Sequence, residues 1–404
     1  MKKPSRRKKA RRTKKRKESQ RTQKLSREVR ELYAAVGTSE DISVDEEDWG
    51  ETFLEAPEEP TRRPDDPWQK ARQRSESRDP ENRDRDGERL DGRVIAVSSG
   101  ACAVEKLEPP YESFTCSLPS MLAVDQQSSI AVGDEVHFAA FSKSGQDTLF
   151  RIEEVLPRRT VLSRPDILNP RVERVIAANV DLGVHVVSVI RPPLRLPLID
   201  RYMIAIERGG AEPLICINKV DLLPTAEARA EVEALLEPYR ESGRGVLYCS
   251  VKTGEGLDAL RTLLRDRTAV FVGHSGVGKS SLINGLSPDL ELETRAVSQE
   301  TGKGRHTTTR SSLFHLDGGR IRLIDTPGVR EFGLWRLEPR ELRAYFPDFD
   351  DHAGACRFAD CSHVHEPECA VREAVASGEV AASRYQTYCR ILESLLEEDD
   401  GERG

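Results

Sequence analysis

Short apolar segments predict strands in the first ordered part of the chain, which begins near Leu90. Five runs rich in β-branched or apolar residues are separated by Gly, Pro, Ser or Asp, a pattern typical of strands joined by turns. These runs are Gly92–Ser98, Ala101–Glu105, Ser113–Leu118, Glu135–Ala140 and Leu149–Val155. They predict an all-β barrel of the OB-fold kind over residues 88–158. Such barrels commonly bind oligonucleotides, although small barrels also serve as protein adaptors.

Beyond Pro165, apolar runs alternate with helical patterns. The runs are Val184–Ile190, Pro213–Ile217, Gly245–Cys249, Ala269–Val272 and Ile321–Ile324. Helical stretches precede three of them, at Leu198–Glu207, Ala226–Tyr239 and Gly256–Arg265. Near-continuous apolar strands separated by helices predict a mostly parallel sheet covered on both faces. We assign this α/β domain to residues 168–335.

A third, smaller region follows over residues 336–398. A Cys/His cluster opens it, and a helical pattern with one apolar stripe closes it. The stripe comprises Tyr385, Tyr388, Ile391, Leu392, Leu395 and Leu396. Spacing of this kind indicates core packing rather than a partner surface. The chain is therefore predicted to be multidomain, with a barrel, an α/β domain and an α-rich C-terminal domain.

Charge separates the first 86 residues from the rest. Residues 1–30 carry sixteen Lys or Arg against Glu18 and Glu28, whereas acidic residues dominate from about residue 40 to 90. Neither stretch holds enough apolar surface to offset the entropy of ordering, so residues 1–86 are predicted to be mostly disordered. The basic run is expected to attract a polyphosphate such as RNA. A solubilising tail and an organellar transit peptide are the weaker alternatives.

No apolar run approaches the ~20 residues that span a bilayer, and no signal-peptide segment follows Met1, so we expect no membrane association. Eight cysteines are present, and three of them crowd into fourteen residues beside histidines. That distribution favours a metal site in a reducing cytoplasm over a disulfide framework.

A phosphate-binding loop is predicted at Gly273–Ser280, which reads G-x-x-x-x-G-K-S. Its members are Gly273, His274, Ser275, Gly276, Val277, Gly278, Lys279 and Ser280, and Ser281 begins the helix-forming stretch behind them. The glycines let backbone N–H groups turn toward phosphate oxygens. Lys279 would neutralise β- and γ-phosphate charge as a catalytic group, and the Ser280 hydroxyl would bind Mg²⁺. An apolar strand before the loop and a helix after it complete this signature.

A guanine-reading motif, Asn218-Lys219-Val220-Asp221, directly follows another apolar run. A carboxylate at Asp221 can accept hydrogen bonds from the N1–H and the exocyclic amine of guanine, which adenine lacks. Ser250 and Lys252 follow the next run and resemble the Ser-Ala-Lys motif that supports the base. Carboxyl ends of parallel strands are where such sheets bind ligands. The predicted nucleotides are therefore GTP and GDP.

Residues for Mg²⁺ and the γ-phosphate are predicted at Asp325-Thr-Pro-Gly328 and Gly304–Thr309. Asp325 would hold Mg²⁺ through water, and the Gly328 N–H would meet the γ-phosphate. Either Thr308 or Thr309 would supply a second Mg²⁺ ligand from a loop that γ-phosphate orders.

The order of these motifs is permuted, because the guanine motif precedes the phosphate loop. The segment after Gly328 then leads directly to the Cys/His region, to which nucleotide state could be transmitted. Val329 stands where Ras-like proteins carry a water-orienting Gln, so we expect slow intrinsic hydrolysis accelerated by a partner. His306 is the candidate substitute, with packing or an RNA contact as its alternative roles.

The Cys/His cluster predicts one structural Zn²⁺ ion. Cys356, Cys361, His363 and Cys369 form a Cys₃His set suited to a closed tetrahedral site. His365 is a rival fourth ligand, and His352 is less well placed.

Taken together, residues 90–396 resemble the ribosome small-subunit-dependent GTPase A (RsgA) family. The resemblance rests on the barrel, Asn218–Asp221, Gly273–Ser281, Gly304–Thr309, Asp325–Phe332 and the Cys/His cluster. It implies an OB-fold, a circularly permuted GTPase domain and a zinc domain. It also implies late maturation of the small ribosomal subunit, which would stimulate hydrolysis, and contact with its rRNA. His306 matches the family's proposed catalytic histidine, and the four ligands match its zinc site, whereas the long tail departs from the usual short N-terminus.

Two other functions remain open from the sequence. The chain could be a GTP-gated binding switch on another RNA or ribosomal particle, in which hydrolysis only ends one round of binding. Alternatively, the nucleotide site could be vestigial in a zinc and OB module that binds RNA. Intact Asp221, Lys279, Ser280 and Asp325 disfavour the vestigial reading. We expect a cytoplasmic monomer.

Overall fold

The computed structural model describes the chain from residue 88 to residue 401, with interruptions. The described ranges are 88–98, 101–118, 130–144, 147–166, 172–190, 192–287, 311–325, 334 and 337–401. The predicted tail (1–86) therefore lies outside them. So do His306, Thr308, Thr309, Gly328 and Val329.

The five predicted barrel strands are confirmed with small changes of boundary. They are β1 (Leu90–Ser98), β2 (Ala101–Lys106), β3 (Ser113–Ser117), β4 (Glu135–Ser144) and β5 (Asp147–Val155). Pairing runs β1–β2–β3–β5–β4, and β4 returns to β1, so the strands close on themselves. Apolar side chains such as Val94, Val104 and Phe138 fill the interior. Closure removes the unpaired edges that an open sheet would expose.

Within the described residues, the sheet of the α/β domain has the strand order β10-β9-β8-β11-β13-β12. These strands are β8 (Leu182–Ser188), β9 (Glu212–Asn218), β10 (Gly245–Tyr248), β11 (Thr268–Val272), β12 (Ser312–Leu316) and β13 (Ile321–Asp325). The first five in the sheet are parallel, and β12 is antiparallel to β13. The sequence pattern missed β12. It also missed the hairpin of β6 (Val161–Pro165) and β7 (Glu173–Ala178) that joins the barrel to this domain.

Helices cover both faces of this sheet, as predicted. Alternate strand residues pack against α5 (Leu196–Arg208) and α6 (Ala226–Glu241) on one face. The other face packs against α7 (Leu257–Leu264) and α8 (Lys279–Leu286). Because parallel strands are buried on both faces, β8 and β11 have no exposed side chain. The nucleotide motifs stand at the carboxyl ends of β9, β10, β11 and β13.

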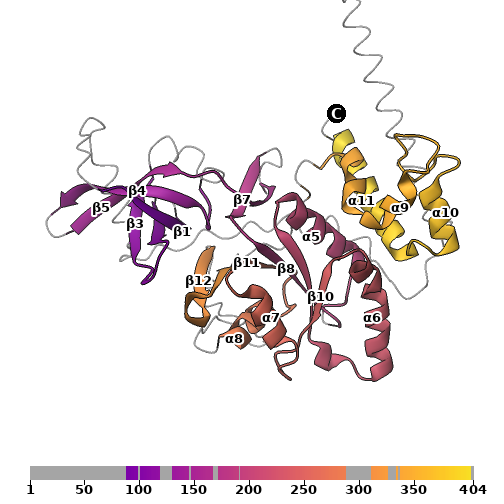
Figure 1. Cartoon of the computed structure of the whole chain (residues 1–404), viewed down its shortest axis with the longest axis horizontal. Coiled ribbons are helices and arrows are strands. Elements are labelled where there is room, and N and C mark those ends of the chain that lie inside the picture. The colour runs from indigo at the N-terminus through magenta and orange to yellow at the C-terminus, as the bar shows by residue number, and fades with distance from the viewer. Residues whose placement is uncertain are drawn as a thin grey trace, which may run out of the picture.

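The C-terminal region is a small helical domain with its own core. Short 3₁₀ turns and α9 (Asp350–Ala353) precede α10 (Ala370–Ser377) and the long α11 (Ala382–Gly401). The predicted apolar stripe lies on α11 and is buried in this core, so the packing interpretation is confirmed. Figure 1 shows this domain and the barrel on opposite sides of the α/β domain.

Both outer domains are tied to the central one. Arg384 on α11 is buried against Asp200 on α5, and its guanidinium lies 2.7 Å from Asp348 Oδ2. On the barrel side, the Asn179 amide donates to the Gly133 carbonyl at 3.0 Å. A Cβ atom at Gly133 would lie 2.0 Å from the Ala178 carbonyl oxygen, so the barrel backbone meets the hairpin at close range.

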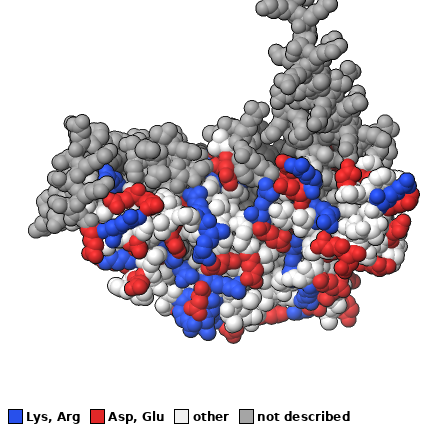
Figure 2. Space-filling view, turned by 45° about the horizontal axis from the view of Figure 1, so that its top comes forward, with Lys and Arg blue, Asp and Glu red and all other residues white. Residues whose placement is uncertain are grey.

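None of the described helices is long and apolar enough to cross a bilayer. On the face shown in Figure 2, basic and acidic side chains are interspersed over the described surface.

Candidate functional site

The phosphate loop joins β11 to α8, as the sequence predicts. Three glycines adopt positive φ angles: +139° at Gly273, +82° at Gly276 and +98° at Gly278. A Cβ atom at Gly273 would lie 2.2 Å from the Val186 carbonyl oxygen, so this position tolerates no side chain. Successive turns of this kind bring backbone N–H groups into a concavity that suits a phosphate. Lys279, Ser280 and Ser281 then form the first turn of α8.

The Lys279 ammonium lies over this loop. Its Nζ donates hydrogen bonds to the carbonyl oxygens of Gly273 at 2.6 Å and His274 at 3.0 Å. These contacts hold the positive charge at the mouth of the concavity, where β- and γ-phosphates would bind. His274 and Ser275 are exposed beside it, whereas the Val277 side chain is buried beneath.

The guanine motif begins where β9 ends, and it is fastened to the phosphate loop. The Asn218 Nδ2 donates to the Val277 carbonyl oxygen at 2.8 Å. The next residue, Lys219, has φ +62°, and its Nζ donates to the Gly276 carbonyl oxygen at 2.5 Å. Two segments far apart in the sequence therefore form one site. Neither hydrogen bond was predicted from the motif.

Asp221 is oriented by the segment that follows β10. The Ser250 hydroxyl donates to Asp221 Oδ1 at 2.6 Å, and the Lys252 ammonium lies 3.9 Å from Oδ2. Gly256 permits this loop to approach closely, since a Cβ atom there would lie 2.0 Å from the Tyr248 carbonyl oxygen. A carboxylate fixed in this way can read the paired donors of guanine.

Asp325 ends β13 at the same edge of the sheet. Ser312 of β12 lies directly opposite it in the antiparallel register. Asp325 and Ser280 carry oxygen atoms of the kind that Mg²⁺ binds, and both are within the described ranges as the candidate magnesium ligands.

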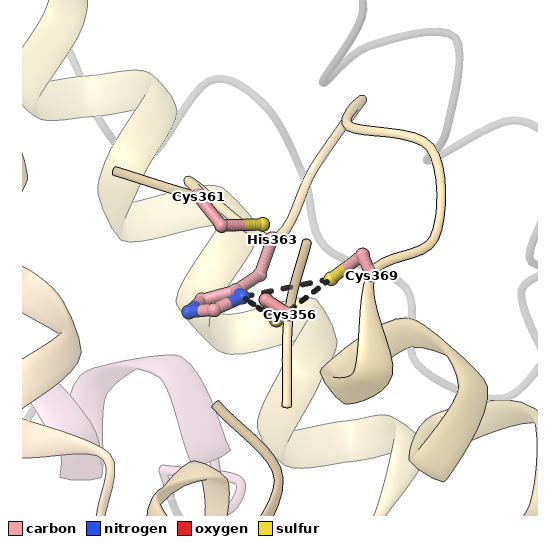
Figure 3. A group of neighbouring side chains, drawn as sticks. All are labelled: Cys356, Cys361, His363 and Cys369. Carbon is pink, nitrogen blue, oxygen red and sulfur yellow. Dashed lines mark hydrogen bonds between the residues drawn. The ribbon is translucent and has the colours of Figure 1, made fainter. Parts of the chain in front are cut away.

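The Cys/His cluster brings together the four predicted zinc ligands. The ligand atoms of Cys356, Cys361, His363 and Cys369 all lie within 4.8 Å of one another. His363 Nδ1 is 3.6 Å from Cys356 Sγ and 3.5 Å from Cys369 Sγ, and the two sulfur atoms are 3.9 Å apart. Zinc bond lengths at tetrahedral angles give roughly 3.5 Å for nitrogen to sulfur and 3.8 Å between sulfurs. Figure 3 shows the four side chains converging on one point. The site therefore fits one Zn²⁺ ion.

The surrounding residues hold this loop in place. Tyr385 and Tyr388 on α11 donate their hydroxyls to the carbonyl oxygens of His363 and Ser362, at 2.7 and 3.0 Å. Glu366 accepts hydrogen bonds from the Ser362 amide and hydroxyl at 2.9 and 2.8 Å. Although burial opposes it, these bonds lower the pKa of Glu366 to about 2.

The rival histidines lie outside this cluster. His365 Nε2 is 3.7 Å from Glu366, and His352 Nδ1 is 3.8 Å from Glu379. No disulfide forms at any of the eight cysteines, all of which fall within the described ranges.

His185 is a further residue beneath the site that the sequence did not single out. It lies on β8 opposite Val272, the last residue before the phosphate loop. Its ring is fully buried and stacks on Tyr202 at 4.0 Å, and neither ring nitrogen has a hydrogen-bond partner among the described residues. Burial, helped by the charge of Lys279, lowers its pKa to about 3. The sequence around His185 is an apolar run with one histidine, and this pattern does not predict a buried ring without hydrogen-bond partners.

Comparison with known proteins now identifies the family. The family model described as RsgA GTPase matches residues 155–335. The small ribosomal subunit biogenesis GTPase RsgA of Haemophilus influenzae is 42% identical over 311 residues, which cover 77% of this chain and 86% of the relative. The chain belongs to the RsgA GTPase family. The Vibrio cholerae RsgA is 47% identical over 275 residues, covering 67% of this chain and 69% of the relative.

Solved structures agree with this membership. YjeQ from Thermotoga maritima matches with a TM-score of 0.61 and 34% identity, covering 76% of this chain and 99% of its own. YloQ, described as a circularly permuted GTPase, matches with a TM-score of 0.59 and 28% identity over 80% of this chain and 99% of its own. As an RsgA family member, this chain is a circularly permuted GTPase that hydrolyses GTP in ribosome biogenesis.

Proposed function

We propose that this chain binds the small ribosomal subunit and its rRNA late in maturation, and that hydrolysis, stimulated by the subunit, releases it. The observation that carries the proposal is the fastening of Asn218 and Lys219 to the phosphate loop. This contact brings the guanine motif and the phosphate loop together, which supports a GTP site in a chain whose relatives are named small ribosomal subunit biogenesis GTPases.

In this proposal each motif has a defined task. Asp221 selects guanine, with Ser250 and Lys252 supporting it, and the loop from Gly273 to Ser281 with Lys279 binds the phosphates. Mg²⁺, held by Ser280, Asp325 and either Thr308 or Thr309, would supply charge neutralisation at the β- and γ-phosphates. The Gly328 N–H meets the γ-phosphate.

Hydrolysis requires a water molecule to attack the γ-phosphorus while the bond to the β–γ bridging oxygen breaks, giving GDP and phosphate. Val329 cannot orient that water, because its side chain carries no polar atom. We assign the role of orienting this water to His306, on the basis of the family resemblance and of its sequence position two residues before Thr308.

We assign three structural parts to this function: an OB barrel (88–158), the GTPase domain (168–335) and the zinc domain (336–398). The barrel and the charged N-terminal tail are the proposed rRNA-contacting parts, and Cys356, Cys361, His363 and Cys369 hold the structural Zn²⁺. The protein acts as a cytoplasmic monomer with no membrane partner.

Sedimentation of the full chain with purified small subunits tests the proposal. We expect co-sedimentation with a non-hydrolysable GTP analogue and release with GDP. A Lys279→Ala variant, which lacks the phosphate-binding ammonium, should lose this nucleotide dependence. Equal binding in GDP and in the analogue would contradict hydrolysis-coupled release.

Two outcomes would favour the alternatives. Nucleotide-dependent binding to large subunits or to unrelated RNA, but not to small subunits, would favour a switch on another particle. Binding of subunits without any GTP binding would favour the vestigial interpretation.

A further inference from the structure

A strand of the barrel pairs with the edge strand of the GTPase sheet, β12, which lies next to the strand that ends in Asp325. Strand β1 of the barrel pairs with β12, through Ala96 opposite Ser312. Ser312 in turn lies opposite Asp325 of β13. One row of neighbouring strands therefore runs from the barrel to Asp325, across a single intervening strand.

A buried side-chain contact fastens the opposite end of β12. Glu105 of β2 is only 3% exposed, and its carboxylate lies 2.8 and 2.9 Å from His315 Nε2. Tyr111 stacks on the His315 ring with centroids 4.2 Å apart and planes inclined by 19°. Tyr111 also packs against the β12–β13 turn, since a Cβ atom at Gly319 would lie 2.9 Å from its ring. These groups form a clamp between the barrel and β12, which we call the Glu105–His315 clamp.

Charged side chains extend the clamp across the sheet. Arg93 of β1 lies 4.0 Å from Glu105 and 3.5 Å from Glu135. On the next strands, His315 lies opposite Arg322, and the Arg322 Nε donates to the Thr268 hydroxyl at 2.9 Å. Thr268 begins β11, the strand that ends in the phosphate loop. The polar row therefore connects the barrel with two strands of the nucleotide site.

We propose that Glu105 and His315 are positioning residues for the partner-stimulated part of GTP hydrolysis only. They fix β12 to the barrel, so that binding of a partner to the barrel alters the placement of Asp325. Because coupling between two sites is reciprocal, nucleotide at Asp325 should also alter the stability of the barrel strands. Buried polar contacts restrict the arrangements of the elements they join, and here they join the barrel to β12, the neighbour of the strand that ends in Asp325. This inference rests on the proposed function, since the small ribosomal subunit would be the partner that binds the barrel.

Hydrogen exchange in the full chain tests the clamp without any ribosomal particle. Exchange is measured for amides in β1 and β2 with Mg²⁺ and either GDP or a non-hydrolysable GTP analogue. We expect the two nucleotides to differ by at least about five-fold in wild type, the low end of ordinary coupling. The difference should vanish in Glu105→Gln and in His315→Gln.

A matched control is Asp91→Asn. Asp91 pairs with His137 at 2.5 Å, but this contact joins β1 to β4 within the barrel. The control should keep the wild-type nucleotide response. The melting temperatures of Glu105→Gln and His315→Gln show whether each variant is folded. If one of them does not fold, the other still tests the clamp. Barrel exchange that ignores nucleotide in wild type, or that responds unchanged in both clamp variants, would overturn the proposal.

Hydrolysis rates give the second readout. Clamp variants should keep their intrinsic GTPase rate and subunit affinity within about two-fold while losing at least about five-fold of the stimulated rate. An equal loss in Asp91→Asn would overturn the assignment. If wild type shows no stimulation, the proposed function fails, while the exchange experiment still decides the clamp.

Discussion

Asn218 Nδ2 donates a 2.8 Å hydrogen bond to the Val277 carbonyl oxygen, and this contact joins the guanine motif to the phosphate loop. Gly278, the next residue, makes the approach possible. A Cβ atom there would lie 2.4 Å from Asn218 Nδ2, at a φ of +98° that side chains rarely adopt. The two halves of the nucleotide site are therefore positioned by one another.

Replacing Gly278 with Ala should weaken GTP binding by at least about ten-fold, equivalent to about 1.4 kcal/mol. The added methyl group displaces Asn218 as well as straining the backbone. Gly243→Ala is the matched control, because Gly243 has φ +82° but nothing within 4 Å of the added atom. Fluorescent-nucleotide titration checks both variants. Equal weakening of GTP binding in the two variants would contradict a specific role for the close approach of Gly278 to Asn218.

The buried joint between the GTPase and zinc domains makes a second prediction. The Arg384 guanidinium contacts Asp200 and Asp348 and lies 4.6 Å above the Tyr239 ring. Arg384→Met leaves Asp200 buried without this partner, which should cost about 3–5 kcal/mol.

Thermal unfolding compares this variant with Arg343→Met. Arg343 pairs with Asp350 in an exposed contact at 3.2 Å, so its loss should cost no more than about 1 kcal/mol. Equal melting temperatures for the two variants would contradict a stabilising role for the joint.

The zinc site distinguishes two histidines two positions apart. His363→Ala removes a ligand and should abolish the single equivalent of bound zinc. His365→Ala should retain it, because His365 lies beside Glu366 outside the cluster. Elemental analysis of the purified variants gives the stoichiometry. Zinc loss in His365→Ala with retention in His363→Ala would reverse the ligand assignment.

His185 predicts an acid-dependent loss of stability. Its pKa is lowered from 6.5 to about 3 by burial and by Lys279, so the unfolded chain takes up a proton that the folded chain does not. Above pH 6.5 the residue is neutral in both states and has no effect on stability, whereas between pH 6.5 and about 3 the free energy of unfolding falls as the pH is lowered. By pH 5 the loss is about 2 kcal/mol.

His185→Phe keeps an aromatic ring against Tyr202 and removes the titrating group. Melting temperatures at pH 7.5 and 5 should therefore fall further for wild type than for this variant. Identical pH dependence in the two proteins would show that His185 does not titrate differently on folding.

Local patterns sufficed to predict much of this fold. Each of the five barrel strands and the apolar strands of the sheet appears near its predicted position, because alternation and buried runs are local properties. The glycine positions of the phosphate loop were similarly readable, since a tight turn requires them.

Long-range contacts were not readable in this way. Glu105 and His315 are separated by 210 positions, and Arg384 and Asp200 by 184. Nothing in the neighbours of Glu105 indicates a partner on β12, and β12 itself was missed because its five residues include a polar serine and histidine. Such pairings depend on the topology of the permuted sheet rather than on local spacing. For the zinc site, the sequence left a choice between His363 and His365 as the fourth ligand. The structure places His363, and not His365, within the cluster.

The most direct test of the account is the initial rate of GTP hydrolysis with and without purified small ribosomal subunits. We expect slow turnover alone and strong stimulation by subunits, because Val329 leaves the attacking water without an orienting side chain. His306→Ala should bind GTP normally but lose the stimulation. Wild-type turnover that is unchanged by subunits would contradict the central claim, and full stimulation of His306→Ala would remove His306 from the mechanism.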